Sequence, residues 1–349
     1  MQNQIKKFLF LFYLFFSVVS FSQTHKLISI SQKIDLLLKT KAIRPFNGNI
    51  IIAKNGKIKY SKTLGYADFE KKTPLNLKNQ FVIGSISKQI TAVLVLQELD
   101  KKHLNLNDPI SKYLKELKQG WADSISIHQL LNHTSGIVDL NKPLAFKPGT
   151  QFSYSGEGYK LLGEIVEKTS GITFAILLKK LFIKCKMTGS TDPSSNNKNN
   201  MVNGYSKQAD QKVKLEKETY ESNIVAAGLM ISTVKDLISW NDKLHHGKLL
   251  SKESYKKMTT ASSIRNHPIF GEVGYGYGIQ INEKNGILEL GHGGNVPGFV
   301  SINFYYPKNN ISLIILENID WKDDNFKETF FFEEEVRKML RNDILMHSK

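Results

Sequence analysis

The hydrophobic pattern near the start of the chain predicts one helix and one hairpin. Apolar side chains recur at helical spacing over 27–38, which is typical of a helix with one buried face. Two runs of strand type follow, at 47–53 and 57–67. Asn55-Gly56 joins these runs, and this dipeptide tolerates the positive φ angles of a tight turn. We therefore expect a β-hairpin here.

The pattern near the other end predicts a second group of strands and a closing helix. Four segments alternate or run apolar over strand lengths, with short turn-rich links between them, at 275–281, 286–290, 299–306 and 311–317. They indicate an antiparallel meander. The segment 326–345 is rich in Glu, Lys, Arg, Phe and Leu and is typical of a helix that lies on a sheet.

The middle of the chain has a different pattern. Residues 89–222 are mostly helical in their spacing, with loop-like interruptions such as 189–200, and no internal repeat is present. The pattern predicts one α+β domain over 23–349, whose sheet subdomain, at about 23–88 and 223–349, encloses a helical subdomain at 89–222. A cleft between the two parts is the natural place for a site.

The start of the chain has the features of a signal peptide. Lys6 and Lys7 precede an apolar run at 8–21, and the small residues Ser20 and Ser22 flank its end. The run is shorter than the roughly 20 residues that a membrane-spanning helix needs. We expect a signal peptide over residues 1–22, no membrane insertion after its cleavage, and export to the periplasm or beyond the cell. An uncleaved N-terminal anchor is the alternative.

Charge and histidine spacing narrow the range of partners. The 349-residue chain carries a formal charge of +16, but its lysines are scattered rather than gathered with aromatic residues, which is unlike a nucleic-acid binder. A solvated surface fits better, and weak attraction to anionic envelope polymers is the alternative. The histidines lack metal-ligand spacing with supporting carboxylates, so we expect no metal and no cofactor. The sequence does not specify an oligomeric state.

The candidate chemistry begins with Ser85 and Lys88. They are three residues apart at the start of a strongly apolar helical segment, and this spacing places both side chains on one helix face. A serine hydroxyl is a poor nucleophile unless a neighbouring group accepts its proton, and a buried lysine amine can do so. Taken alone, such a pair more commonly means a capping serine followed by a solvated lysine.

Further motifs follow Ser85 and Lys88 in order. They are Tyr154-Ser155-Gly156, His292-Gly293-Gly294, LLNHTSGI at 130–137 and AAGLMISTVKDL at 226–237. With these motifs the chain resembles the serine β-lactamase and penicillin-binding protein superfamily, in particular its class C-related branch of D-aminopeptidases, DD-peptidases, esterases and β-lactamases. The resemblance implies an antiparallel five-stranded sheet built from both chain ends, flanked by helices, with an inserted and mostly helical subdomain.

The resemblance also implies roles for three residues in acyl transfer. Ser85 would be the acylated nucleophile, Lys88 its proton acceptor, and Tyr154 a second proton-transfer group held close to both. No cofactor takes part in this chemistry.

Substrate and oxyanion binding would fall to the strand that carries the His-Gly-Gly motif. His292 stands where the family has the lysine of K-T-G, on an edge strand facing Ser85, and would orient the substrate or contribute positive potential. A satisfied structural histidine is the alternative. The amides of Ser85 and Asn295 would stabilise the oxyanion. Gly293 and Gly294 would let the strand approach a substrate closely.

Two departures from the family pattern bear on the substrate. Gly156 replaces the asparagine of Y-x-N, and His-Gly-Gly replaces K-T-G, so groups that would hold a β-lactam are missing. We therefore expect a small-molecule or peptide substrate, such as a D-amino-acid peptide, including cell-wall-derived peptides, or a small ester. A β-lactamase or carboxylesterase is the alternative within enzymes. A non-catalytic receptor for peptidoglycan fragments is the alternative outside them.

Overall fold

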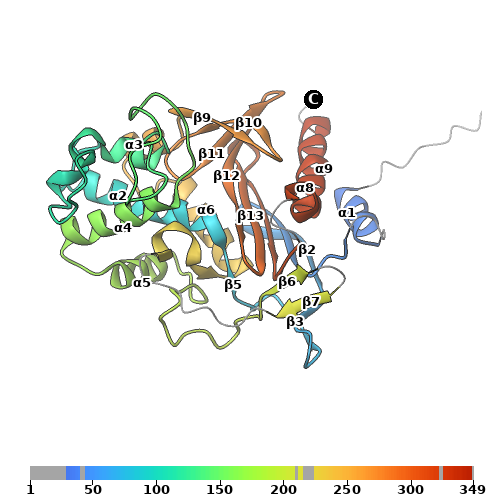
Figure 1. Cartoon of the computed structure of the whole chain (residues 1–349). Helices are drawn as coiled ribbons and strands as arrows, with labels where there is room; N and C mark the ends of the chain where they lie inside the picture. Colours follow the sequence, from blue (N-terminus) through green and yellow to red (C-terminus); the bar gives the residue numbers. More distant parts are fainter. Residues whose placement is uncertain (1–28, 40–43, 209–210, 215–223, 322–324, 348–349) are drawn as a thin grey trace, which may run out of the picture.

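The centre of the protein is an eight-stranded antiparallel sheet (Figure 1). The computed structural model describes residues 29–39, 44–208, 211–214, 224–321 and 325–347. The strands in spatial order are β2 (Lys57–Leu64), β1 (Gly48–Lys54), β14 (Ile311–Glu317), β13 (Phe299–Tyr306), β12 (Ile287–Val296), β11 (Gln280–Lys284), β10 (Gly271–Tyr275) and β9 (Ser263–His267).

The two chain ends meet in this sheet, as the sequence predicts. β1 and β2 form the expected hairpin, and Asn55 and Gly56 have φ angles of 54° and 70° in its turn. β1 also pairs with β14 along its whole length, with Ile51 opposite Ile314. An α+β fold with a sheet from both chain ends is therefore confirmed.

The expected strand number was too small. The first five strands in the spatial order match the expected sheet, and β11, β10 and β9 extend it beyond β12. As a result β12 is an inner strand over 287–291, whereas His292 lies in the part of β12 that pairs with β13 alone, so the expected edge position holds at this residue but not for the whole strand. β11 pairs only with 287–291 of β12, whereas β13 pairs with it as far as Val296.

The segment 275–281, expected as one strand, is a turn between two. β10 ends at Tyr275 and β11 begins at Gln280. Gly278 has φ +66°, a left-handed conformation that glycine adopts at little cost. A Cβ at Gly278 would lie 2.4 Å from the carbonyl oxygen of Lys88. The turn therefore passes directly beside the first turn of helix α2 (Ser87–Asp100).

Helices cover both faces of the sheet (Figure 1). On one face lie α1 (Ile30–Lys39), α8 (Phe326–Thr329) and α9 (Phe331–His347); their core includes Ile34, Ile50 and Val336. The closing helix expected over 326–345 is thus interrupted at Phe330. The other face packs on the second core, which contains Ile51 and Ile314, because neighbouring residues of a strand point to opposite faces.

The second face supports the helical part of the chain. Its helices are α2, α3 (Ile127–Leu131), α4 (Gly156–Ser170), α5 (Phe174–Lys184), α6 (Val234–His245) and α7 (Lys252–Met258). Short 3-10 turns occur at η1 (Gly84–Ile86), η2 (Ile110–Lys112), η3 (Ala122–Ser124) and η6 (Pro307–Asn309), and a π-turn at η5 (Val225–Leu229). Small sheets pair β3 (Tyr66–Asp68) with β4 (Thr73–Pro74), β5 (Phe81–Val82) with β8 (Ile231–Ser232), and β6 (Tyr205–Gln208) with β7 (Gln211–Lys214) and β15 (Ile319–Asp320).

The structure leaves two expectations untested. The expected signal peptide over residues 1–22 lies outside the described residues. The expected boundaries between the sheet subdomain and the helical subdomain stay a prediction. Within the described ranges, no helix is long and apolar enough to cross a membrane.

Candidate active site

Ser85 and Lys88 meet where η1 joins α2. The Nζ of Lys88 lies 3.2 Å from the Oγ of Ser85 and also donates to the carbonyl of Ala227. Lys88 is only 3% exposed, whereas Ser85 is half-buried. Solvent and small molecules therefore reach the hydroxyl but not the amine behind it.

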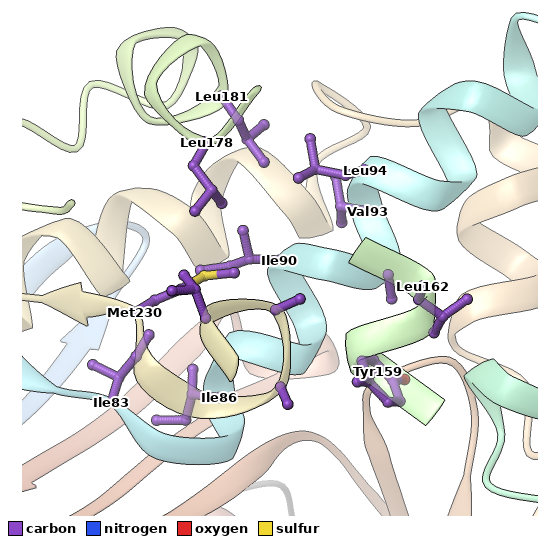
Figure 2. Close-up of a cluster of buried hydrophobic side chains, with 14 of the residues drawn as sticks. Ile83, Ile86, Ile90, Val93, Leu94, Tyr159, Leu162, Leu178, Leu181 and Met230 are labelled. Carbon is purple, nitrogen blue, oxygen red and sulfur yellow. The ribbon is translucent and has the colours of Figure 1, made fainter. Parts of the chain in front are cut away.

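The burial of Lys88 follows from the sequence around it. α2 is apolar on nearly all sides, and Figure 2 shows Ile90, Val93 and Leu94 packed among side chains of other helices. The segment around η5 fixes the first turn of α2 by hydrogen bonds. Thr91 Oγ1 donates to the carbonyl of Ala226 over 2.7 Å, and the amide of Met230 donates to Ser87 Oγ over 3.2 Å.

Tyr154 joins the pair from the start of α4. Its ring centroid lies 4.9 Å from Nζ of Lys88. Ser155, the next residue, caps α4 by accepting the amide of Gly158 over 3.1 Å, which fixes the backbone beside the phenol. The hydroxyl of Tyr154 is buried and has no hydrogen-bond partner among the described residues. Its hydrogen-bonding capacity is therefore not used within the described part of the protein.

The backbone of β12 lies against η1, next to the nucleophile candidate. Gly84 has φ +53°, and a Cβ there would lie 2.9 Å from Cα of Gly294 and 3.1 Å from the amide nitrogen of Asn295. A Cβ at Gly294 would lie 2.5 Å from the carbonyl oxygen of Ile83. Both glycines are required for this close approach. The backbones of η1 and β12 therefore run side by side. The amides of Ser85 and Asn295 lie on these two adjacent segments, as two donors to one oxyanion must.

His292 is held by a chain of hydrogen bonds that begins at the backbone of Ser155. The Ser155 amide donates to Nδ1 of His133 over 3.1 Å. Nε2 of His133 lies 3.1 Å from the hydroxyl of Tyr275, which lies 3.0 Å from Nε2 of His292. Nδ1 of His292 lies 2.5 Å from the carbonyl oxygen of Gly293.

The two ends of this chain fix every proton in it. A backbone amide can only donate, so Nδ1 of His133 accepts and its Nε2 carries the proton. The Tyr275 hydroxyl therefore accepts from His133 and donates to Nε2 of His292, whose Nδ1–H donates to the Gly293 carbonyl. Both imidazoles are neutral in this arrangement. Burial is the main cause that holds the pKa of His133 and of His292 well below the ordinary value, and the charges of Lys88 and Arg265 act in the same direction.

This environment differs from the one expected for His292. Both ring nitrogens are engaged within the protein, so neither is left for a substrate, and the neutral ring adds no positive potential. His292 instead ties β12 to Tyr275 at the end of β10. The alternative of a satisfied structural histidine describes its hydrogen bonds better.

Three residues of the site were not predicted from the sequence: His133, Tyr275 and Arg265. His133 stands in the LLNHTSGI motif, which was a signal for it, and it takes a left-handed φ of +61°. Arg265 belongs to β9, which was not expected, and Tyr275 is the first residue of the segment 275–281 that was expected as one strand. The guanidinium carbon of Arg265 lies 4.3 Å from the ring centroid of Tyr154, so a second cation borders this phenol.

No cluster of three or more His, Cys, Asp or Glu side chains suited to a metal ion is found in the part of the chain that the structure describes. The groups brought together here are a hydroxyl, an amine, a phenol, a guanidinium and backbone amides. Such a set supports acyl transfer through a serine nucleophile.

Comparisons with known proteins identify the family of this chain. The chain matches the family described as Beta-lactamase over residues 41–336. It is 25% identical over 312 residues to Penicillin-binding protein 4* of Bacillus subtilis (strain 168), covering 78% of this chain and 68% of that protein. It is 28% identical over 302 residues to Protein flp of Staphylococcus aureus (strain N315), covering 78% of this chain and 59% of flp. The chain thus spans about three fifths of the length of flp.

The solved structures include a similar enzyme of nearly the same extent. The D-stereospecific amidohydrolase from Streptomyces sp. superposes with a TM-score of 0.72 at 26% identity, covering 86% of this chain and 97% of the other.

Proposed function

Since the chain belongs to the Beta-lactamase family of serine hydrolases, we propose that it is an exported hydrolase that forms an acyl-enzyme at Ser85. Its substrates are D-amino-acid peptides, their amides, or small esters. The observation that carries this proposal is the 3.2 Å contact between Lys88 and Ser85 beside the unpartnered hydroxyl of Tyr154.

The geometry gives each group a step. Ser85 Oγ attacks the substrate carbonyl carbon as its proton passes to the amine of Lys88. The amides of Ser85 and Asn295 stabilise the oxyanion, and one such donor contributes about 3 kcal/mol in the transition state. Tyr154 relays the proton to the leaving group as the bond to it breaks. Water then attacks the ester at Ser85 and releases the acyl group.

Two observations favour D-amino-acid substrates over β-lactams. Gly156 leaves open space where the family pattern has an asparagine, since a Cβ there would meet no atom within 4 Å. His292 is neutral and internally bonded where that pattern has a charged lysine. The similar Streptomyces protein is a D-stereospecific amidohydrolase, which points in the same direction.

The test is a substrate panel with two serine variants. Wild-type protein, Ser85→Ala and Ser124→Ala are assayed with p-nitrophenyl esters, D-amino-acid amides, D-Ala-D-Ala peptides and nitrocefin. Ser124 is the control, because it is an exposed serine whose hydroxyl donates to the carbonyl of Trp121 within η3. We expect turnover of the D-amino-acid substrates or esters in the wild type and the control, and none in Ser85→Ala. Equal turnover in Ser85→Ala would refute the proposed nucleophile. An inert wild type that still binds D-Ala-D-Ala peptides would favour the receptor.

The intact mass of the recovered protein tests the proposed export separately. Intact mass of the protein recovered from the periplasm or medium should correspond to a mature chain that begins at Gln23. Recovery of the full-length chain in the membrane fraction would favour the anchor.

A further inference from the structure

His133 occupies a backbone position that usually belongs to glycine. Its amide donates to the carbonyl of Leu130 over 3.4 Å, and the amide of Thr134 donates to that of Gln129 over 2.9 Å. These two bonds form a Schellman motif at the end of α3, and His133 is its left-handed residue, with φ +61°. A left-handed φ costs a residue with a Cβ roughly 1 kcal/mol, so we looked for what the imidazole does in return.

His133 binds the backbone on both sides of Tyr154. The amide of Ser153 donates to the carbonyl oxygen of His133 over 2.9 Å, and the amide of Ser155 donates to Nδ1 of its ring over 3.1 Å. The ring also lies against the phenol, with the two ring centroids 4.3 Å apart. The hydroxyl of Tyr154 has no hydrogen-bond partner among the described residues, so contacts to its backbone and its ring determine where the phenol lies.

The imidazole can hold the phenol because it is itself fixed. It is buried, and its Nε2 lies 3.1 Å from the hydroxyl of Tyr275. The ring centroids of Tyr275, Tyr159 and Phe152 lie 4.9, 5.1 and 5.7 Å from its own. Both nitrogens of His133 are engaged within the protein, so an effect of this residue on the reaction must pass through Tyr154.

We propose that His133 is a positioning residue for Tyr154, and that the expulsion of poor leaving groups depends on its Nδ1 acceptor. This inference rests on the proposed function, in which Tyr154 passes a proton to the leaving group. A displacement of about 1 Å in such a donor costs up to about 100-fold in rate. The substrates affected are amides and alkyl esters, whose leaving groups need a proton, and not activated esters.

A purely structural role for His133 makes a different prediction, because damage to the fold lowers turnover of every substrate alike. Two esters of N-acetyl-D-alanine separate the two roles. The p-nitrophenyl ester expels a phenolate that needs no proton, whereas the methyl ester expels an alkoxide that must take one up as the bond breaks. Both esters give the same acyl-enzyme, so their kcat/KM values compare the acylation step alone.

Three substitutions of His133 are compared with the wild type. His133→Asn keeps an acceptor for the Ser155 amide and tolerates the left-handed φ. His133→Phe keeps a ring and His133→Gly keeps the backbone conformation, but both remove the acceptor. Tyr154→Phe is the reference for loss of the proton donor. The matched control is His128→Asn, at a half-buried histidine within α3 whose ring bonds to the hydroxyl of Tyr277.

We expect Tyr154→Phe to lower kcat/KM about 100-fold or more for the methyl ester and less than about tenfold for the p-nitrophenyl ester. His133→Phe and His133→Gly should lower it about 10- to 100-fold for the methyl ester and less than about threefold for the other. His133→Asn and the control should stay within about threefold of the wild type on both esters. Added to Tyr154→Phe, His133→Phe should bring no further selective loss, because the two substitutions act through one group.

Circular dichroism and fluorophosphonate labelling of Ser85 are measured on every variant. If Tyr154→Phe is selective, then equal losses or no losses in the two acceptor-free variants, or no rescue by His133→Asn, would overturn the inference and leave the proposed function standing. Failure of both acceptor-free variants to fold would overturn it as well, since His133 would then serve the fold. An unselective Tyr154→Phe would refute the role of Tyr154 as proton donor, and the inference with it. A wild type that does not label at Ser85, or that turns over neither ester, would instead refute the proposed function.

Discussion

The amine of Lys88 lies 3.2 Å from the hydroxyl of Ser85, and it is almost fully buried while the hydroxyl is reachable from solvent. A proton acceptor in this position is protected from competing solvent protons. The contact also fixes the direction in which the serine proton leaves. The proposed acylation of Ser85 depends on this contact.

Removing the amine should stop acylation without unfolding the protein. Methionine fills a similar volume, so we expect Lys88→Met to keep its fold and to lose about 100-fold or more in kcat/KM. Pre-steady-state burst kinetics on a p-nitrophenyl ester measure the acylation step. Lys101→Met, at the exposed C-cap of the same helix, is the control and should keep the wild-type burst. A normal burst in Lys88→Met would exclude Lys88 as the proton acceptor.

The close approach of η1 to β12 predicts a contrast between two glycines. Gly84 and Gly56 both have positive φ, at +53° and +70°, but a Cβ at Gly56 meets nothing within 4 Å. Alanine at Gly56 should cost only the left-handed strain, about 1 kcal/mol, and leave activity unchanged. Alanine at Gly84 adds a clash with Gly294 and the Asn295 amide, so we expect at least about a tenfold loss in the rate of fluorophosphonate labelling. Equal labelling rates for the two variants would show that the contact does not shape the site.

The hydrogen-bond chain through Tyr275 predicts a stability difference between two tyrosines. Tyr275→Phe leaves a buried nitrogen unpaired on both His133 and His292, which should lower the free energy of unfolding by about 2–4 kcal/mol. Tyr277→Phe is the matched control, since among the described residues its hydroxyl bonds to the half-buried His128 alone, and it should cost about 1 kcal/mol. Urea unfolding measures both.

Nitrogen-15 NMR of the histidine rings tests the same chain of hydrogen bonds directly. The proton should sit on Nε2 of His133 and on Nδ1 of His292 in the wild type. The opposite tautomer at either ring would be incompatible with the hydrogen-bond directions derived from the Ser155 amide and the Gly293 carbonyl.

Four histidines with lowered pKa values predict how stability depends on pH. Burial, as the main cause, lowers the pKa of His245 and of His267 to about 3, and lowers that of His133 and of His292 well below the ordinary value. These groups take up protons on unfolding below about pH 6.5, so the unfolded chain binds more protons than the folded one there. Stability is therefore fully present above about pH 6.5. It falls as pH drops, by about 1.4 kcal/mol per pH unit for each group.

Urea midpoints between pH 7.5 and 5 measure this slope, and His267→Asn provides a control. Nδ1 of His267 accepts the amides of Ile269 and Phe270, and an asparagine oxygen can replace it without titrating. In this variant, the free energy of unfolding should fall with pH less steeply than in the wild type, by about 1.4 kcal/mol per pH unit. A flat profile in the wild type would mean that these histidines do not stay neutral in the folded protein.

The parts of the fold that the sequence predicted share a clear local signal. β1, β13 and β14 are long apolar runs, and the hairpin turn contains Asn55-Gly56. β9, by contrast, has the sequence SIRNH, whose exposed edge position needs no apolar alternation. The glycines around Tyr277 were mistaken for part of a strand, because their turn is determined by contact with Lys88 and not by local pattern.

The same distinction applies to the site: residues in motifs with a local signal were predicted, and residues placed by distant parts of the chain were not. Ser85, Lys88 and Tyr154 stand in motifs with chemistry of their own, and the structure brings them together. Arg265 had no such signal, because its place beside Tyr154 depends on β9 folding back along the sheet. The engagement of Nε2 of His292 depends likewise on Tyr275, which is 17 residues away in sequence.

The most direct measurement is the mass of the protein after reaction with a fluorophosphonate, followed by peptide mapping. Covalent reaction requires a hydroxyl made nucleophilic by the amine behind it, so a single adduct should form on the peptide that contains Ser85 and be absent from Ser85→Ala. An unmodified wild-type protein, or an adduct that maps to another residue, would contradict the assignment of Ser85 as the nucleophile.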